Sequence, residues 1–146
     1  MVGPDPELNI LKKNFIMQNS GLISTHINEY FPKCSYGSEI RHLDLTNNKL
    51  HDISVIWNLA NLESICLSKN FIREIIIGKP LPSLKKLVCF DNILEKVEGL
   101  MHSTNLKILN LGMNKLRRFP VTELKELKEL ILSFNNLQSV TELENC

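Results

Sequence analysis

One eleven-residue pattern recurs five times along this chain and limits what the chain can fold into. The pattern is L-x-x-L-x-L-x-x-N-x-L, in which isoleucine or cysteine sometimes replaces leucine, and its copies begin at residues 40, 62, 84, 106 and 127. Consecutive starts are therefore 22, 22, 22 and 21 residues apart. A fixed period of this length is typical of a chain built from stacked, similar units.

The pattern predicts a short strand and a turn in every unit. In the central L-x-L, alternate side chains face opposite ways, so the leucines point into the core. The asparagine stands where the chain turns, and its amide is suited to satisfy backbone groups of its own and neighbouring turns. Stacking predicts a parallel sheet on a concave face and a buried asparagine ladder, defined here as Asn48, Asn70, Asn92, Asn114 and Asn135.

The second half of each unit predicts a thin convex side. Apolar residues follow the asparagine at a spacing near three, as in the first unit at Leu50, Ile53, Ile56 and Leu59. This spacing suits 3₁₀ turns or short irregular helix. The predicted fold is therefore α/β: a curved right-handed solenoid with a parallel sheet on the concave face, a short 3₁₀ or irregular convex side, and an N-terminal helical cap.

The five segments over residues 40–146 resemble the leucine-rich repeat. They are similar to the 22-residue class typified by the leucine-rich-repeat regulatory subunit of protein phosphatase 1. Axonemal dynein light chain 1 and many ciliary and centrosomal proteins share that class. The resemblance is specific for the fold, whereas many unrelated functions occur on one fold.

Residues 1–39 are predicted to cap the first strand, which would otherwise be an open edge. Residues 5–17 favour a helix, because Asp5 suits its N-cap and Pro6 its first position. An alternative is that the end of this stretch forms a degenerate first repeat. In that repeat Phe15 and Met17 point inward, Ser20 replaces the turn asparagine, and Leu22 is the apolar residue that follows. A convex-side helix over 23–31 and a loop over 32–39 follow, and the helix is expected to pack inward through Ile23, Ile27, Tyr30 and Phe31.

The five repeats are predicted to occupy residues 40–146, and the sequence stops at Cys146 inside the fifth. The last repeat of a solenoid needs a polar cover. We therefore expect further chain, or a partner, to cover that edge. The alternative is a naturally short protein whose last repeat is frayed.

Composition excludes several classes. The 146 residues include 43% hydrophobic and 23% charged residues with a net charge of +1, which is unlike a disordered chain or a strongly basic nucleic-acid binder. No run approaches the roughly 18 apolar residues of a membrane span, and the start lacks the pattern of a signal peptide. The four cysteines lack metal-type spacing, so free thiols and an intracellular location, cytoplasmic or nuclear, are expected.

Motifs for catalysis or for cofactor binding are not found in the sequence, so the chain is predicted to be no enzyme and to hold no cofactor or metal. One group of residues could suit catalysis, because stacking brings together His42, Asp44, Ser64 and Cys66. A thiol beside an imidazole oriented by a carboxylate suits nucleophilic catalysis. Any concave face juxtaposes polar residues in this way, however, and no oxyanion site is evident. Cys89 fills a leucine position and is predicted to be core.

The concave face carries the candidate binding site. The first two repeats present small polar groups there, whereas the last three present an apolar strip formed by Val88, Phe90, Ile108, Met113, Ile131 and Phe134. A basic margin adjoins it, with Lys85, Lys107 and Lys128 in one column and Lys86 beside them. Exposed apolar patches of this kind mark partner sites. An amphipathic helix or an acidic segment of another protein would suit this face.

The leading hypothesis is a non-enzymatic scaffold or adaptor that binds a partner protein on its concave face. The resemblance implies an alternative, a regulatory subunit of a Ser/Thr protein phosphatase, whose site in that family uses acidic and aromatic side chains in the middle column. In this sequence the middle column consists of Asp44, Cys66, Val88, Asn110 and Ile131. Only Asp44 fits the family's pattern. Further alternatives are a ribonucleoprotein component, against which the near-zero net charge argues, and a ciliary, centrosomal or motor adaptor. A second basic group, expected to be a solvated edge, consists of Lys115, Arg117 and Arg118.

Overall fold

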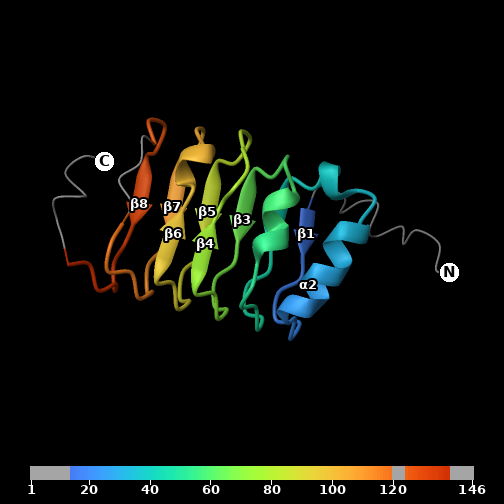
Figure 1. The fold of residues 1–146 in the computed structure, drawn as a ribbon, viewed down its shortest axis with the longest axis horizontal. Helices are drawn as coiled ribbons and strands as arrows, with labels where there is room; N and C mark the ends of the chain where they lie inside the picture. Colours follow the sequence, from blue (N-terminus) through green and yellow to red (C-terminus); the bar gives the residue numbers. More distant parts are fainter. Residues whose placement is uncertain (1–13, 120–123, 139–146) are drawn as a thin grey trace.

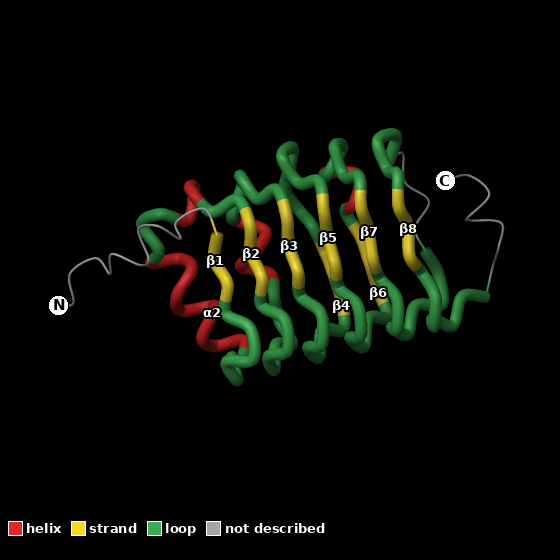
Figure 2. Tube along the Cα trace, turned by 180° about the vertical axis from the view of Figure 1, so that it is seen from behind, coloured by secondary structure: helices red, strands yellow, loops and turns green. Residues whose placement is uncertain are grey.

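Six short parallel strands form the main sheet of the protein. The structure is a computed structural model, and it describes residues 14–119 and 124–138. The sheet order follows the chain, apart from β4 and β6, which lie in a second sheet. Figure 2 shows the strands side by side in one row in front of the remaining segments, and Figure 1 shows the molecule from the opposite side, with α2 (Ser24–Tyr30) toward the viewer. The strands are β1 (Asn14–Ile16), β2 (His42–Asp44), β3 (Ser64–Cys66), β5 (Lys86–Val88), β7 (Ile108–Asn110) and β8 (Glu129–Ile131).

The register stacks one leucine or isoleucine per strand into the core. Leu43 pairs with Ile65, Ile65 with Leu87, and Leu87 with Leu109. All four side chains are buried, as the alternation of a strand requires. The core thins at the last described repeat, where Leu130 is only partly buried although its register partner Leu109 is fully buried.

The convex side is thin and changes its structure along the solenoid. The 3₁₀ helices there are Phe31–Lys33, Gly37–Glu39, Ser54–Asn58 and Leu100–His102. Between the last two, β4 (Glu74–Ile76) pairs in parallel with β6 (Lys96–Glu98). The spacing of the apolar residues did not predict this second sheet. Runs rich in β-branched residues, such as Ile75 and its neighbours, favour an extended backbone over a 3₁₀ turn.

The N-terminal region differs from the prediction in three places. Residues 14–16 form β1, which pairs with β2 and aligns Phe15 with Leu43, so the strand of a degenerate first repeat is confirmed and a helix over 5–17 is wrong there. Residues 5–13 lie outside the described residues. The convex-side helix, α2, spans Ser24–Tyr30. Ile27 and Phe31 pack inward as predicted, whereas Ile23 is 42% exposed and Tyr30 39% exposed. Met17 is likewise exposed, at 39%, so it does not point inward as the degenerate repeat predicted.

Two further predictions about the ends have different outcomes. The loop over 32–39 contains the end of one 3₁₀ helix and the whole of a second, so it is more regular than expected. The uncovered last repeat falls partly on residues 139–146, which lie outside the described residues. The division of the chain at residue 40 stays a prediction.

The asparagine ladder forms as predicted and links each repeat to the next. Asn70 accepts a hydrogen bond from the Leu50 N–H (3.0 Å) and donates to the carbonyls of Leu45 (3.0 Å) and Leu67 (3.0 Å). The Leu45 carbonyl also accepts from Asn48 (2.9 Å). The same pattern recurs through Asn135, which is half-exposed, unlike the other four. Amide side chains thus satisfy the buried backbone groups of every turn.

Candidate functional site

The outer face of the main sheet changes from polar to apolar along the solenoid. In the column that begins with His42, register places Ser64, Lys86, Ile108 and Glu129 next to one another. In the column two residues later it places Asp44, Cys66, Val88, Asn110 and Ile131. These are the columns that the sequence predicted. We define the sheet-face patch as the partly exposed apolar residues on β5, β7, β8 and the segment after β5: Val88, Phe90, Ile108 and Ile131.

Phe90 and Ile131 meet above a glycine. A Cβ atom placed on Gly112 would lie 3.2 Å from Phe90 Cδ2 and 3.4 Å from Ile131 Cγ2. Gly112 is itself buried. The absence of a side chain therefore allows the Phe90 ring to lie against the backbone that follows β7, and the apolar surface is continuous from β5 to β8.

A row of lysines borders the sheet-face patch where the strands begin. Backbone bonds hold the row in place: the Lys107 N–H donates to the Lys85 carbonyl (2.8 Å) and the Lys128 N–H to the Lys107 carbonyl (2.8 Å). With Lys86 they form what we call the lysine row. In the described part of the chain, none of these four ammonium groups has an ion pair. The row is thus a positive margin, with Glu129 as the acidic residue next to Lys128.

Met113 and Phe134 lie beyond the sheet face, in the turn that follows their strands. Both have the left-handed backbone, with φ of 52° and 57°. Met113 is 42% exposed and Phe134 80% exposed. The equivalent residue of every described repeat has the same conformation, at Asn19, Asn47, Lys69 and Asp91. The repeat pattern identified this position but gave no sign of its backbone conformation.

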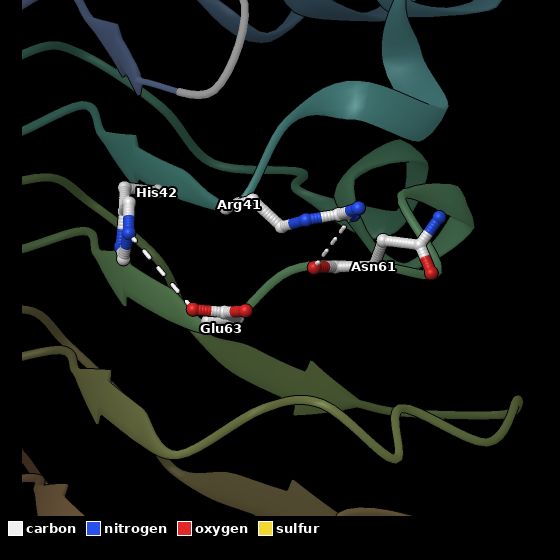
Figure 3. Close-up of polar contacts among 4 residues, drawn as sticks. All are labelled: Arg41, His42, Asn61 and Glu63. Atoms are coloured by element: carbon white, nitrogen blue, oxygen red, sulfur yellow. Dashed lines mark hydrogen bonds and ion pairs between the residues drawn. The ribbon is translucent and has the colours of Figure 1, made fainter.

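The polar half of the face uses its charged groups within the sheet. Figure 3 shows His42 pointing across to Glu63, whose carboxylate lies 4.0 Å from His42 Nε2. Arg41 donates to the carbonyls of Ser38 (3.2 Å) and Asn61 (3.5 Å). These contacts tie the start of β2 to the start of β3.

The polar group of His42, Asp44, Ser64 and Cys66 makes contacts that differ from those of a catalytic triad. Asp44 accepts from the N–H (3.0 Å) and hydroxyl (2.6 Å) of Thr46, and Cys66 Sγ lies 3.1 Å from the same hydroxyl. His42 is directed to Glu63 instead. The arrangement orients no imidazole toward the thiol, which nucleophilic activation requires.

The described residues offer neither a metal-binding cluster nor a membrane-spanning helix. The described ranges contain no cluster of three or more His, Cys, Asp or Glu side chains suited to a metal ion. Within residues 14–119 and 124–138, helices long and apolar enough to cross a membrane are also absent.

The described cysteines are free, as expected. Cys34 and Cys66 are partly buried, and Cys89 is fully buried at its predicted core position. Burial raises the pKa of the Cys89 thiol, and the nearby Cys66 adds a smaller effect in the same direction. The thiol of Cys89 is therefore a packing group rather than a reactive one.

The remaining predicted group, Lys115, Arg117 and Arg118, is exposed at the turn after β7. Lys115 and Arg117 line a cavity of about 400 Å³ together with Glu95 and Asn136. Sequence reasoning treated this edge as solvated surface and missed the cavity, because its walls come from three different repeats.

Comparisons with known proteins agree with this architecture. No family model matches the chain. The chain is 32% identical over 136 residues to the protein phosphatase 1 regulatory inhibitor subunit PPP1R7 homolog of Arabidopsis thaliana, covering 92% of this chain and 41% of that protein. An internalin from Listeria monocytogenes superposes with a TM-score of 0.66 at 27% identity, covering 75% of this chain and 33% of the internalin. The chain is a leucine-rich repeat protein.

Another relative of this leucine-rich repeat protein is mimecan of Bos taurus, which is 29% identical over 116 residues, 73% of this chain and 37% of mimecan. The chain spans about two fifths of the length of the two curated relatives. None of the three relatives is named as an enzyme. They support an interaction scaffold as the general role of this fold.

Proposed function

We propose that the chain is a protein-binding module and that its partner binds the sheet-face patch. One observation carries the proposal. Three apolar side chains on three adjacent strands, and Phe90 in the segment after β5, form one outer surface beside four lysines that lack ion pairs in the described residues. A soluble protein gains little from such a surface unless it is covered.

The chemistry of the surface defines the partner. The sheet-face patch offers one aromatic ring and three aliphatic side chains, so the partner should contribute apolar side chains that exclude water. The lysine row favours carboxylates at the margin of the contact. A single aromatic residue offers no stacking row for bases, and a net charge of +1 offers weak attraction to phosphates, which favours protein over nucleic acid.

A second candidate function is regulation of a Ser/Thr protein phosphatase. The identity of 32% to a phosphatase 1 regulatory inhibitor subunit supports it. The middle column of the sheet argues for a different set of contacts, because it places Val88, Asn110 and Ile131 where the resembling family uses acidic and aromatic side chains. If the chain binds the phosphatase, the sheet-face patch should replace those contacts by apolar ones.

The test compares two isoleucines at matched outward positions. Ile108→Asp places a charge in the sheet-face patch, and Ile76→Asp places the same charge on the exposed face of β4 in the convex layer. Each variant and the wild type are used to capture proteins from a eukaryotic lysate, and purified phosphatase 1 catalytic subunit is tested separately by biolayer interferometry.

We expect a captured partner that Ile108→Asp loses and Ile76→Asp retains, with affinity that falls as salt rises. Identical partners for all three proteins would contradict a site on the sheet face. Binding of the phosphatase subunit to the wild type and to Ile76→Asp, but not to Ile108→Asp, would select the second candidate.

A further inference from the structure

A second exposed apolar surface runs along the edge where the strands end. We define the turn rim as Phe71, Ile93, Met113 and Phe134, one residue from each of four consecutive repeats. Each lies directly beside a ladder asparagine, after it for Phe71 and Ile93 and before it for Met113 and Phe134. Phe71 is 47% exposed, and Phe134 at 80% is the most exposed large apolar side chain of the described residues. These turns lie side by side along one edge of the sheet (Figures 1 and 2).

The backbone beneath the turn rim is fixed from repeat to repeat. The Phe71 N–H donates to the Leu50 carbonyl (2.9 Å), the Ile93 N–H to the Ile72 carbonyl (3.1 Å), and the Met113 N–H to the Ser133 carbonyl (2.9 Å). Phe71 also stacks on His51, with 5.6 Å between the ring centroids. The rim therefore presents its side chains on a preorganised support, which lowers the entropy that a partner must overcome.

Backbone conformation sets two of these residues apart. The left-handed region suits asparagine and aspartate, which occupy the same turn position at residues 19, 47 and 91. Methionine and phenylalanine are strained there, and the exposed Phe134 ring gives little core packing in return. Neither local conformation nor folding accounts for these side chains. Strain retained at exposed positions is a feature of functional sites.

Charged side chains flank the turn rim. Three cations lie two positions from a rim residue, namely Lys69, Arg73 and Lys115, and Arg117 lies two positions beyond Lys115. The carboxylates of Asp91 and Glu95 lie two positions from Ile93. Over the described residues, none of these six side chains takes part in an ion pair. The cavity of about 400 Å³ beside Lys115 and Arg117 opens at this edge and fits a carboxylate side chain. The rim is thus an apolar row with a net positive border.

We propose that the turn rim binds an acidic amphipathic helix of another protein, lying across the repeats. Neighbouring parallel strands are about 4.8 Å apart, and one helical turn advances about 5.4 Å, so successive turns of a helix can meet successive repeats. Phe71 and Ile93 share one turn position, and Met113 and Phe134 share another two residues away, so the helix crosses the repeats obliquely. An extended partner strand would fit less well. Its side chains on one face are roughly 6.6 Å apart, so they would lose register with the repeats within three repeats. The acidic flanks of the helix face Lys115 and Arg117. This inference does not rest on the sheet-face patch.

The experiment selects single helical peptides from a phage-displayed library of randomised helices, using the whole chain as target. The selected peptides are then synthesised and their affinities measured. The test variant is Met113→Asn with Phe134→Asn, which supplies the residue that the same turn uses at positions 19 and 47 and so keeps the fold. A second variant, Lys115→Glu with Arg117→Glu, alters exposed side chains only, and Ile108→Asp is the control on the sheet face.

We expect the selected peptides to be acidic, with apolar residues at i, i+4 and i+7. Their affinity should fall at least about tenfold with either double variant and stay within about twofold with Ile108→Asp. Selection of no helical peptide, or of peptides that bind both double variants like the wild type, would overturn the proposal. Peptides lost only with Ile108→Asp would overturn it too, while supporting the sheet-face site.

Discussion

Replacing Asn70 by alanine should remove a large part of the stability of this protein. The change leaves the buried Leu50 N–H without its acceptor, which costs about 1–3 kcal/mol. A longer bond from Asn70 to the Ser68 carbonyl (3.3 Å) is lost with it. Two shorter bonds are lost as well, but the Leu45 carbonyl keeps Asn48 as a donor and the Leu67 carbonyl keeps Asn92. Those two losses cost about 0.5–1 kcal/mol each. We therefore expect a total of about 2–5 kcal/mol, against a typical domain stability of about 5–15 kcal/mol.

The control is the same change at the last rung of the ladder. Asn135 makes equivalent bonds but is half-exposed, so water replaces the lost partners and Asn135→Ala should cost about 1–2 kcal/mol. Urea unfolding followed by the fluorescence of Trp57, the one tryptophan of the sequence and 4% exposed, measures both losses. Equal costs at the two positions would refute the argument from buried hydrogen-bond partners.

A third variant separates donation from acceptance. In Asn70→Asp the carboxylate still accepts from the Leu50 N–H but no longer donates to the two carbonyls, so its destabilisation at neutral pH should exceed that of alanine. The folded protein raises the pKa of such a carboxyl, because only its protonated form donates. Stability relative to wild type is therefore retained in acid and lost as pH rises through the folded pKa. A pH-independent difference would contradict this reasoning.

Three other variants and probes test the rest of the fold. Gly99→Ala should destabilise the protein by about 3 kcal/mol, because φ is +82° and the added Cβ would lie 1.9 Å from the Ile77 carbonyl oxygen. A thermal melt measures this loss, and an unchanged melting temperature would contradict the prediction. Asp52→Ala should cost about 1 kcal/mol, because the Ser54 N–H donates to this carboxylate (2.9 Å) and lowers its pKa. The cost in stability should shrink as pH falls through the folded pKa of Asp52. An equal cost in acid would count against this explanation. Cys89 should react with a thiol reagent only after unfolding, as followed by mass mapping of the labelled peptide, and labelling in the native state would show that its site opens.

The sequence by itself determined the repeat, the buried ladder and the columns of the outer face. Each depends on short-range rules: a period of 22 residues sets the stacking, alternation in a strand sets which side chains face out, and asparagine is the residue that satisfies a buried turn. Ile65 and Leu87 are in the core because every repeat repeats the same local geometry. The predicted partner residues therefore occupy the expected positions along the chain.

Only the tertiary structure decided how those positions are used. β1 forms where a helix also suited the local sequence, because β2 offers an edge that backbone bonds satisfy. β4 and β6 pair in the convex layer because each offers the other backbone hydrogen-bond partners. The spacing of the apolar residues alone does not reveal this pairing. The strained backbone of Met113 and Phe134 and the pairing of Asp44 with Thr46 depend on neighbours in space. Contacts between repeats, rather than residue types within one repeat, fix these features.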